Sequence, residues 1–291
     1  MIAVALLLLT LAAGVGFLYW LLIVTEGAYL GSGVVAFLYD RGATSYDRVK
    51  QFDAVDDARR LALPLVRALR GVKRPVVLDV ATGTGRLPQT LLRNLEFEGT
   101  IVGLDVSVGM LREAKRKTAR YHGRVYWLWK DAMDLPFAND SFDAVTCLEA
   151  IEFMRDPVGA VREMARVLRP GGTLVATNRI GLDGLLMPGR AFSKATLEAR
   201  LADLPFVSLE TEQWQTYYDL VWARKEGCLA PGARPREIEQ VLWCPRCHGS
   251  PLSMGSTRVA CESCGSQYPV KDDIILLQTP HVEEPGRGWL R

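Results

Sequence analysis

The N-terminal stretch of this sequence lacks charge, because residues 1–25 contain no Asp, Glu, Lys or Arg. Residues 2–24 are mostly aliphatic, and at about 1.5 Å of rise per residue such a helix crosses the roughly 30 Å hydrocarbon core of a bilayer. The basic residues that precede the apolar run of a cleavable signal peptide are also missing. Burial inside a soluble domain would need a larger core than a chain of this size offers. We therefore expect a transmembrane anchor over residues 1–25, with Tyr19 and Trp20 near the interface.

Basic residues follow this apolar run but do not precede it. The first of them are Arg41, Arg48 and Lys50, so the positive-inside rule predicts a single-pass protein whose main domain lies in the cytoplasm. Residues 26–45 form the expected juxtamembrane connector. Within it, residues 28–39 are too short to span a bilayer, so they either lie along the membrane surface or simply join two parts of the chain.

The sequence also lacks an excess of either charge and has few cysteines. There are 35 Lys and Arg against 33 Asp and Glu, which removes any global argument for nucleic-acid binding. Six cysteines in 291 residues are too few for a disulfide scaffold. Four of them form two Cys-x-x-Cys pairs, which favours a metal site in a reducing compartment. The length allows one substantial domain and one small module.

A glycine-rich turn organises the centre of the chain. Residues 76–80 are an apolar run that predicts a strand buried on both faces, and Gly83 and Gly85 follow it before a helical pattern begins. Glycines at such a turn let the backbone approach a ligand, and the helix N-terminus supplies amides. Asp105 ends the next predicted strand, where a carboxylate would hold a ribose diol. Pro88 stands where a dinucleotide fingerprint would have its third glycine.

Five motifs in this part of the chain resemble, in order, those of class I S-adenosylmethionine-dependent methyltransferases. They are LDVATGTG at residues 78–85, GLDVS at 103–107 with ML at 110–111, DA at 131–132 with LPF at 135–137, SFDAV at 141–145, and RVLRPGGTL at 166–174. The most similar subgroup is the type 11 and quinone-methyltransferase-like branch. The resemblance covers roughly residues 46–224 and implies a Rossmann-like α/β sheet with an antiparallel last strand.

The resemblance also implies a set of residues that bind S-adenosylmethionine, the methyl donor. These are Asp79, Ala81, Thr82, Gly83, Gly85, Asp105, Val106, Met110, Asp131, Ala132 and Cys147. Cys147 lies in an apolar strand, which favours a packing role over that of a nucleophile. Glu149 and Glu152 follow the fourth strand and are the candidate acid/base groups. Glu149 could instead orient the methionine ammonium or cap a helix, and Tyr46 is either a lid contact or an ordinary packing residue.

The remaining elements of this domain follow from periodicity and capping signals. A helical lead-in over residues 45–70 should bend at Pro64 and stop at Gly71. The basic helix at 107–121 either faces anionic headgroups or is a solvated surface. Further predicted elements are strands at 100–104, 124–130, 142–148 and 173–178, helices at 156–168 and 193–204, and a final strand pair at 206–213 and 217–224.

The C-terminal part contains the two cysteine pairs. After a predicted linker at residues 225–240, the four thiols of Cys244, Cys247, Cys261 and Cys264 match a structural zinc site with four cysteine ligands. Residues 241–279 resemble a Trm112-like zinc ribbon, a module that in relatives partners methyltransferases, and residues 280–291 form a tail. The stretch from Cys244 to His248 also fits a c-type haem attachment pattern, which the second cysteine pair and the inferred cytoplasmic side oppose.

These observations predict a membrane-anchored methyltransferase that acts on a small lipophilic acceptor, such as a quinone precursor, an isoprenoid or a lipid. Two alternatives stay open. A tRNA or rRNA methyltransferase could use the ribbon to contact RNA or a partner, although its cations are only Arg246, Arg258 and Lys271. A scaffold that keeps the fold without catalysis is the other. The sequence identifies no protein partner.

Overall fold

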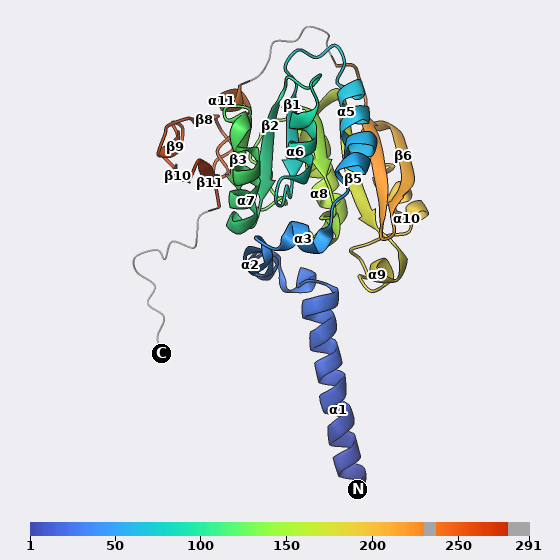
Figure 1. Ribbon diagram of the computed structural model, residues 1–291. Helices are drawn as coiled ribbons and strands as arrows, with labels where there is room; N and C mark the ends of the chain where they lie inside the picture. The colour runs from blue at the N-terminus through green and yellow to red at the C-terminus, as the bar shows by residue number, and fades with distance from the viewer. Residues whose placement is uncertain (230–236, 279–291) are drawn as a thin grey trace.

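A single long β-sheet runs through the domain in the computed structural model, which describes residues 1–229 and 237–278 (Figure 1). Its strand order is β6-β7-β5-β4-β1-β2-β3, and β11-β10-β9-β8 extend it beyond β3. The first seven strands are β1 (Val76–Val80), β2 (Thr100–Asp105), β3 (Val125–Trp129), β4 (Phe142–Cys147), β5 (Leu168–Arg179), β6 (Phe206–Gln215) and β7 (Tyr218–Lys225). Strands β5, β4, β1, β2 and β3 are parallel to one another, whereas β7 runs antiparallel to β5. The predicted sheet with an antiparallel last strand is confirmed.

The central strands are buried because helices cover both faces of the sheet. Every residue of β1 is buried, and its side chains alternate between the faces. Val77 packs with α5 (Leu63–Ala68) and α6 (Arg86–Arg93), whereas Leu78 packs with α8 (Pro157–Val167) on the other face. α7 (Val108–Thr118) packs against Trp127 of β3 and continues into η4 (Ala119–Tyr121). Asp156 caps the N-terminus of α8, since its carboxylate accepts from the Gly159 amide.

Two predicted boundaries are wrong. The helical lead-in breaks at residues 51–53, between α3 (Tyr46–Lys50) and α4 (Ala54–Asp57), because Gln51 adopts a φ of 51° and Asp53 caps the next helix. Pro64 lies in the first turn of α5, directly after the π-helical segment η3 (Ala58–Ala62), so an irregular helical segment does adjoin it. β5 starts at Leu168, five residues early, because Leu168 pairs with Phe142 before a register shift.

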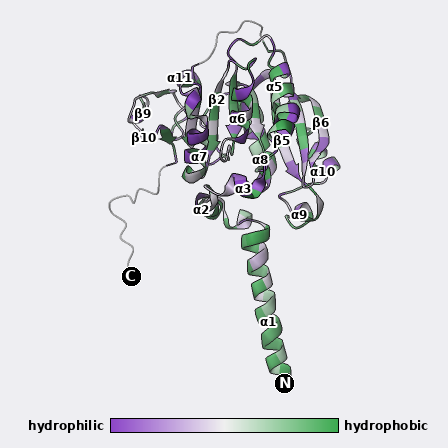
Figure 2. Ribbon diagram, in the orientation of Figure 1, coloured by the Kyte–Doolittle hydropathy of each residue, from purple (hydrophilic) through white to green (hydrophobic). Residues whose placement is uncertain are grey.

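The N-terminal helix leaves the domain as a separate apolar rod (Figures 1 and 2). α1 (Ile2–Tyr19) continues as a π-helical turn, η1 (Trp20–Val24), and these 23 residues are long and apolar enough to cross a membrane. No side chain of α1 is buried against the described part of the chain. Beyond it, η2 (Ala28–Leu30) and α2 (Ser32–Gly42) return along the end of the domain, so residues 28–39 are largely helical.

The C-terminal ribbon is joined to the main sheet edge to edge. β11 (Ile274–Leu276) lies parallel to β3, with Ile275 opposite Leu128. Lys115 of α7 pairs with Asp273 at 2.8 Å, and Leu242 bridges to Phe137. The other ribbon elements are α11 (Ile238–Val241), β8 (Leu252–Ser253), β9 (Arg258–Cys261) and β10 (Gln267–Lys271). Their apolar side chains belong to the same core cluster as the main sheet. The predicted tail at 280–291 and residues 230–236 of the predicted linker lie outside the described residues.

Candidate active site

A cavity of about 540 Å³ opens at the carboxyl ends of the central strands. One part of its wall consists of residues after β1, β2, β3 and β4, where ligands of open α/β sheets bind. The other part consists of η2 and α2, which follow the apolar helix, together with Arg190. A small adjoining cavity of about 40 Å³ lies against the glycine turn and shares Tyr46, Gly83 and Glu149 with the large one.

The glycine turn has the backbone shape that the sequence predicts. Ala81, Gly83 and Gly85 all have positive φ, at 53°, 52° and 78°. A side chain at Gly83 would point into open space, whereas a Cβ at Gly85 would lie 3.0 Å from the Cβ of Ala114. Gly83 therefore leaves room for a ligand beside the turn, and Gly85 permits close packing of α6 on α7.

Two buried carboxylates hold this turn in place. Asp79 accepts hydrogen bonds from the hydroxyls of Thr82 and Thr146, at 2.5 and 2.6 Å. Asp105 accepts from the amides of Gly83 and Ser107, each at 2.8 Å. Burial raises the pKa of both Asp79 and Asp105 to about 6. Each oxygen of Asp105 accepts one of these bonds and retains capacity to accept a ribose hydroxyl.

Eight of the eleven predicted donor-binding residues line a cavity, and three line neither cavity. The large cavity is lined by Ala81, Gly83, Asp105, Val106, Asp131 and Ala132, and the small one by Asp79 and Thr82. Met110, Cys147 and Gly85 line neither cavity. Cys147 is fully buried, and burial raises the pKa of its thiol well above the usual value, as expected for a packing cysteine.

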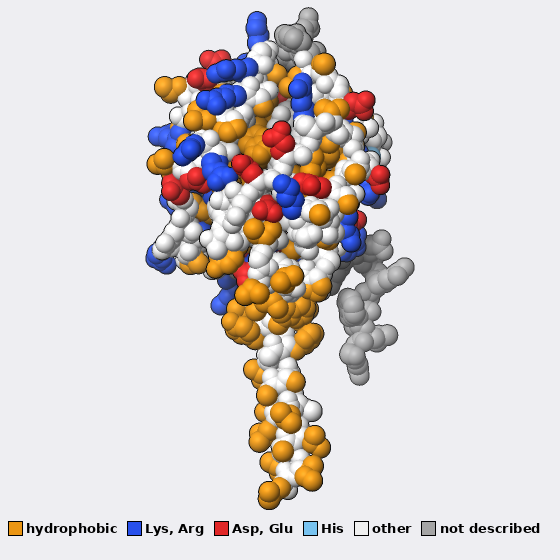
Figure 3. Space-filling view, turned by 90° about the vertical axis from the view of Figure 1, so that its right-hand side faces the viewer, with side chains coloured by type: hydrophobic (Ala, Val, Ile, Leu, Met, Phe, Trp, Pro, Cys, Tyr) orange, Lys and Arg blue, Asp and Glu red, His pale blue; other side chains and the backbone are white. Residues whose placement is uncertain are grey.

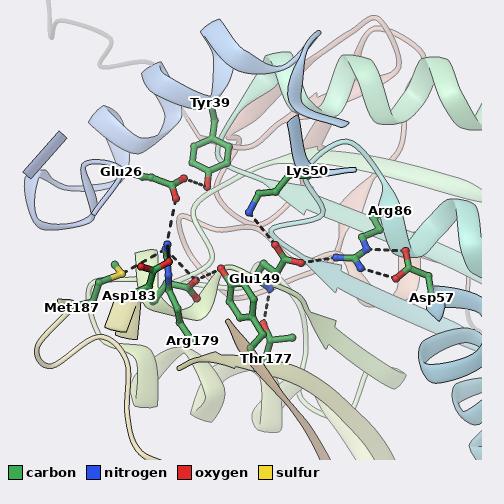
Figure 4. Close-up of polar contacts among 12 residues, drawn as sticks. Glu26, Tyr39, Lys50, Asp57, Arg86, Glu149, Thr177, Arg179, Asp183 and Met187 are labelled. Carbon is green, nitrogen blue, oxygen red and sulfur yellow. Dashed lines mark hydrogen bonds and ion pairs between the residues drawn. The ribbon is translucent and has the colours of Figure 1, made fainter. Parts of the chain in front are cut away.

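Glu149 lies in the walls of both cavities and is bound by two cations (Figure 4). One carboxylate oxygen accepts from Arg86 at 2.6 Å and the other from Lys50 at 3.0 Å. Arg86 also forms a two-bond ion pair with Asp57 and stacks on Phe52. The contact with Lys50 ties α3 to the sheet, so Glu149 positions the segment that covers the glycine turn.

Glu152 does not line either cavity. It is 1% exposed, and its Oε1 accepts from the hydroxyl of Tyr218 at 2.7 Å. Its Oε2 has no hydrogen-bond partner among the described residues. Burial raises the pKa of Glu152. Arg179 lies 3.9 Å from Glu152 and 3.6 Å from Glu26, which links the sheet to the connector after the apolar helix (Figure 4).

Sequence reasoning missed the connector as part of the cavity wall. Tyr39 and Tyr46 both line the cavity, and Tyr39 donates to Glu26 at 2.7 Å. Asp40 accepts from the Ser107 hydroxyl at 2.5 Å and from the Gly109 amide at 2.7 Å, which fixes α2 on the start of α7. The only available signal was the apolar pattern of residues 34–39, which equally suits a membrane surface. Tyr46, for which a lid contact and an ordinary packing role were both predicted, lies in the walls of both cavities.

The four ribbon cysteines form one compact cluster. All four Sγ atoms lie within 4.8 Å of one another, with Cys244 and Cys264 3.7 Å apart and Cys247 and Cys261 3.6 Å apart. Bonds of about 2.3 Å to a tetrahedral zinc ion would give Sγ separations of about 3.8 Å, and a disulfide would need about 2 Å. The cluster therefore fits a zinc ion bound by four thiolates. Each thiol of Cys244 and Cys247 faces a cysteine of the second pair, which disfavours haem attachment.

Comparison with known proteins agrees with this geometry. Residues 77–172 match a family model described as a methyltransferase domain. A demethylmenaquinone methyltransferase from Clavibacter sepedonicus is 34% identical over 143 residues, which are 49% of this chain and 57% of that protein. The ubiquinone/menaquinone biosynthesis C-methyltransferase UbiE from Geotalea daltonii is 35% identical over 143 residues, or 47% and 60% of the two chains. This chain thus spans less than two thirds of the length of these relatives.

A solved structure extends the likeness of fold beyond the matched segment. Magnesium protoporphyrin IX methyltransferase from Synechocystis PCC 6803, with bound S-adenosylmethionine, superposes with a TM-score of 0.52 at 18% identity. The superposition covers 67% of this chain and 97% of that one. With the strand order, the glycine turn and the acid that ends β2, these matches show that residues 77–172 belong to a methyltransferase domain with the class I fold.

Proposed function

We propose that this protein is an S-adenosylmethionine-dependent methyltransferase that acts at a membrane on a small lipophilic acceptor. The cavity carries the proposal, because it brings donor-type residues and the segment after the apolar helix into one space. The names of the relatives favour a quinone-type ring, so a demethylmenaquinone-like quinol with a prenyl tail is the leading acceptor.

The donor would lie with its amino-acid end at the glycine turn and its sugar at Asp105. Asp131 and Ala132, which follow β3, would border the adenine, and Asp79 would keep the turn in shape. Methyl transfer from a sulfonium needs in-line approach and a dry site more than a catalytic group. Of the two predicted acid/base residues, Glu149 lines the cavity and Glu152 does not. Because Glu149 binds both Lys50 and Arg86, it would hold α3 over the glycine turn.

The acceptor would occupy the part of the cavity formed by the connector. Leu30, Val35 and Tyr39 contribute apolar surface there, and Phe153 packs edge-on against Tyr39 with ring centroids 5.9 Å apart. Apolar walls with a few polar groups are typical of sites for lipophilic ligands. This arrangement supports a ring-shaped acceptor with a hydrocarbon tail better than a nucleotide.

The apolar helix would anchor the protein, with the domain on the cytoplasmic side where the methyl donor is made. The ribbon would hold one structural zinc ion through Cys244, Cys247, Cys261 and Cys264. RNA methylation receives less support. The helix cations Lys115 and Lys117 pair with Asp273 and Asp47, and Arg116 pairs with Glu113 at 2.7 Å. Charges paired in this way offer little to a phosphate backbone.

The test is methyl transfer by the full chain reconstituted in lipid vesicles that contain a reduced, prenylated demethylnaphthoquinol and methyl-labelled S-adenosylmethionine. We expect the labelled methylated product by mass spectrometry. Asp105→Ala should abolish it at low donor concentration, because the ribose loses its acceptor. Glu262→Gln, an exposed substitution on the ribbon, is the matched control and should leave turnover unchanged.

Three outcomes would distinguish the lipophilic-acceptor hypothesis from its two alternatives. Donor binding without transfer to any quinol, isoprenoid or lipid tested would overturn the lipophilic acceptor. Methylation of tRNA or rRNA by the same preparation would favour the RNA interpretation. No donor binding by calorimetry at millimolar concentration would leave a non-catalytic scaffold.

A further inference from the structure

A short helix beside the apolar rod exposes an unusual number of leucines. α9 (Gly181–Leu185) and the residue after it carry Leu182, Leu185 and Leu186, which are 78%, 79% and 46% exposed. The one acid of α9, Asp183, turns back to pair with Arg179 at 3.4 Å. The solvent-facing side of α9 is therefore apolar, and nothing in the described part of the chain covers it.

Contacts to the apolar helix place these leucines at a defined depth. The indole N–H of Trp20, near the C-terminal end of the 23-residue apolar run, donates to the carbonyl of Leu186 at 2.9 Å. Tyr29 stacks on Trp20 at 5.1 Å and donates to the carbonyl of Pro188 at 2.8 Å. Tryptophan at the end of a membrane span lies at the headgroup level. Leu186 must then lie at the same level, because its carbonyl is hydrogen-bonded to Trp20, and α9 directly precedes Leu186 in the chain.

One other exposed leucine, Leu95, lacks this arrangement. Leu95 is 98% exposed but lies in the loop before β2, at the end of the sheet away from α1. Scattered residues of this kind are normal, whereas grouped ones mark an interaction surface. Around the base of α1 hydrophobic side chains gather on the face shown in Figure 3. α2 and α9 lie at this same end of the domain (Figure 1).

The loop that follows α9 also contributes to the cavity wall. Arg190, five residues beyond Leu185, lines the cavity, donates to the carbonyl of Ala28 at 3.3 Å and stacks on Tyr29. Leu30 both lines the cavity and is 45% exposed, so it marks the rim. The leucines of α9 and the cavity rim are therefore parts of one structural unit fixed to the end of the apolar helix.

We propose that Leu182, Leu185, Leu186 and Leu30 form a second membrane-contact surface that seats the cavity rim on the lipid bilayer. The inference rests on the proposed membrane anchor and deepens it. The apolar helix alone would leave the domain free to tilt, whereas two contacts fix its orientation. A prenylated acceptor would then pass from the bilayer into the cavity without crossing water. The partner of this surface is the lipid bilayer itself, since the surface continues directly from the apolar helix.

The experiment measures the depth of single labels in the full chain. In a Cys228→Ser background with zinc present, Leu185→Cys carries an environment-sensitive nitrobenzoxadiazole label in phosphatidylcholine and phosphatidylglycerol vesicles. We expect spin-labelled acyl chains to quench it and aqueous iodide not to. Leu95→Cys is the matched control and should show the reverse. The Cys228→Ser parent without an added cysteine gives the background.

A third position separates the two proposals. Leu8→Cys, in the middle of α1, should be quenched by spin-labelled acyl chains if the anchor spans the bilayer. Quenching at position 8 together with iodide access at position 185 equal to that at position 95 would overturn the second contact and keep the anchor. Iodide access at position 8 would overturn both. Quenching by acyl chains at positions 8 and 185 supports both.

Discussion

At the scale of single residues, the two carboxylates of the glycine turn lie where the proposed methyl donor would bind. Asp105 is 7% exposed and Asp79 is 3% exposed, and both keep hydrogen-bond donors that favour the ionised form. Burial nonetheless outweighs these bonds and raises the pKa of each to about 6. The site is therefore sensitive to pH close to neutrality.

We expect the affinity for S-adenosylmethionine to fall on acidification. A ribose hydroxyl donates to ionised Asp105 but loses that acceptor when the acid is protonated. The dissociation constant should stay level above pH 7 and rise roughly tenfold per pH unit below about 6. Calorimetric titration of the full chain between pH 5 and 7.5 measures it. An affinity that does not change over this range would contradict the assignment of Asp105.

Unfolding does not explain such a loss. The pKa values of both acids are higher in the folded chain than the usual value near 4, so protonation stabilises the fold. This contribution is complete below pH of about 4 and is lost as the pH rises through about 6. At pH 5 these groups favour the folded state, so weaker binding there reports on the site. Thermal unfolding at each pH is the control.

At the scale of elements, the ribbon acts as the edge of the main sheet. The amide of Leu277 donates to the carbonyl of Trp129 at 3.1 Å, directly before Lys130 and Asp131 in the cavity wall. An unpaired β3 would expose a row of backbone groups. The pairing of β11 with β3 therefore connects the cysteine cluster to the strand that carries the proposed adenine contacts.

Removing one ribbon ligand should loosen this strand. Structural zinc contributes about 10–16 kcal/mol of apparent binding free energy in small domains, so a ribbon without it should unfold. In Cys261→Ser we expect zinc to be lost and amide exchange at Val125–Trp129 to rise, with Val76–Val80 unchanged. Metal analysis and hydrogen-exchange mass spectrometry measure these effects.

Cys228→Ser is the matched control for this prediction, because Cys228 is exposed and lies outside the cluster. It should retain about one zinc ion per chain, and its amide hydrogen exchange at Val125–Trp129 should equal that of the parent protein. Unchanged protection of β3 in the zinc-free Cys261→Ser variant would show that the strand pairing holds without the metal.

At the scale of the whole molecule, the proposed membrane anchor would decide where the domain resides. Leu8 and Leu11 are 60% and 62% exposed on α1 and would face lipid. Arginine near the middle of a span costs about 2.5–3.5 kcal/mol on insertion scales. Leu8→Arg combined with Leu11→Arg should therefore release the protein from the membrane fraction on flotation. Leu95→Arg, at the far end of the domain, should leave it bound. Continued flotation of the double variant would argue against the anchor.

The sequence by itself determined the class of fold and the glycine turn that lines the cavity. A buried strand, a glycine turn and an acid after the next strand are local patterns, and local backbone preferences encode them in neighbouring residues. The spacing of the cysteines likewise predicted the cluster, because four thiols on two tight turns have few other uses. The N-terminal apolar run could be found from length and composition alone.

Only the tertiary structure decided which residues meet across the chain. Glu149 and Glu152 are three residues apart, yet one lines the cavity and the other is buried behind it. The connector at residues 26–45 became a cavity wall because Asp40 finds partners at the start of α7 and Glu26 lies 3.6 Å from Arg179 of β5. Strand pairing between β3 and β11 was equally hidden, since nearly 150 residues separate them. Such contacts depend on packing between distant segments, for which no local pattern in the sequence exists.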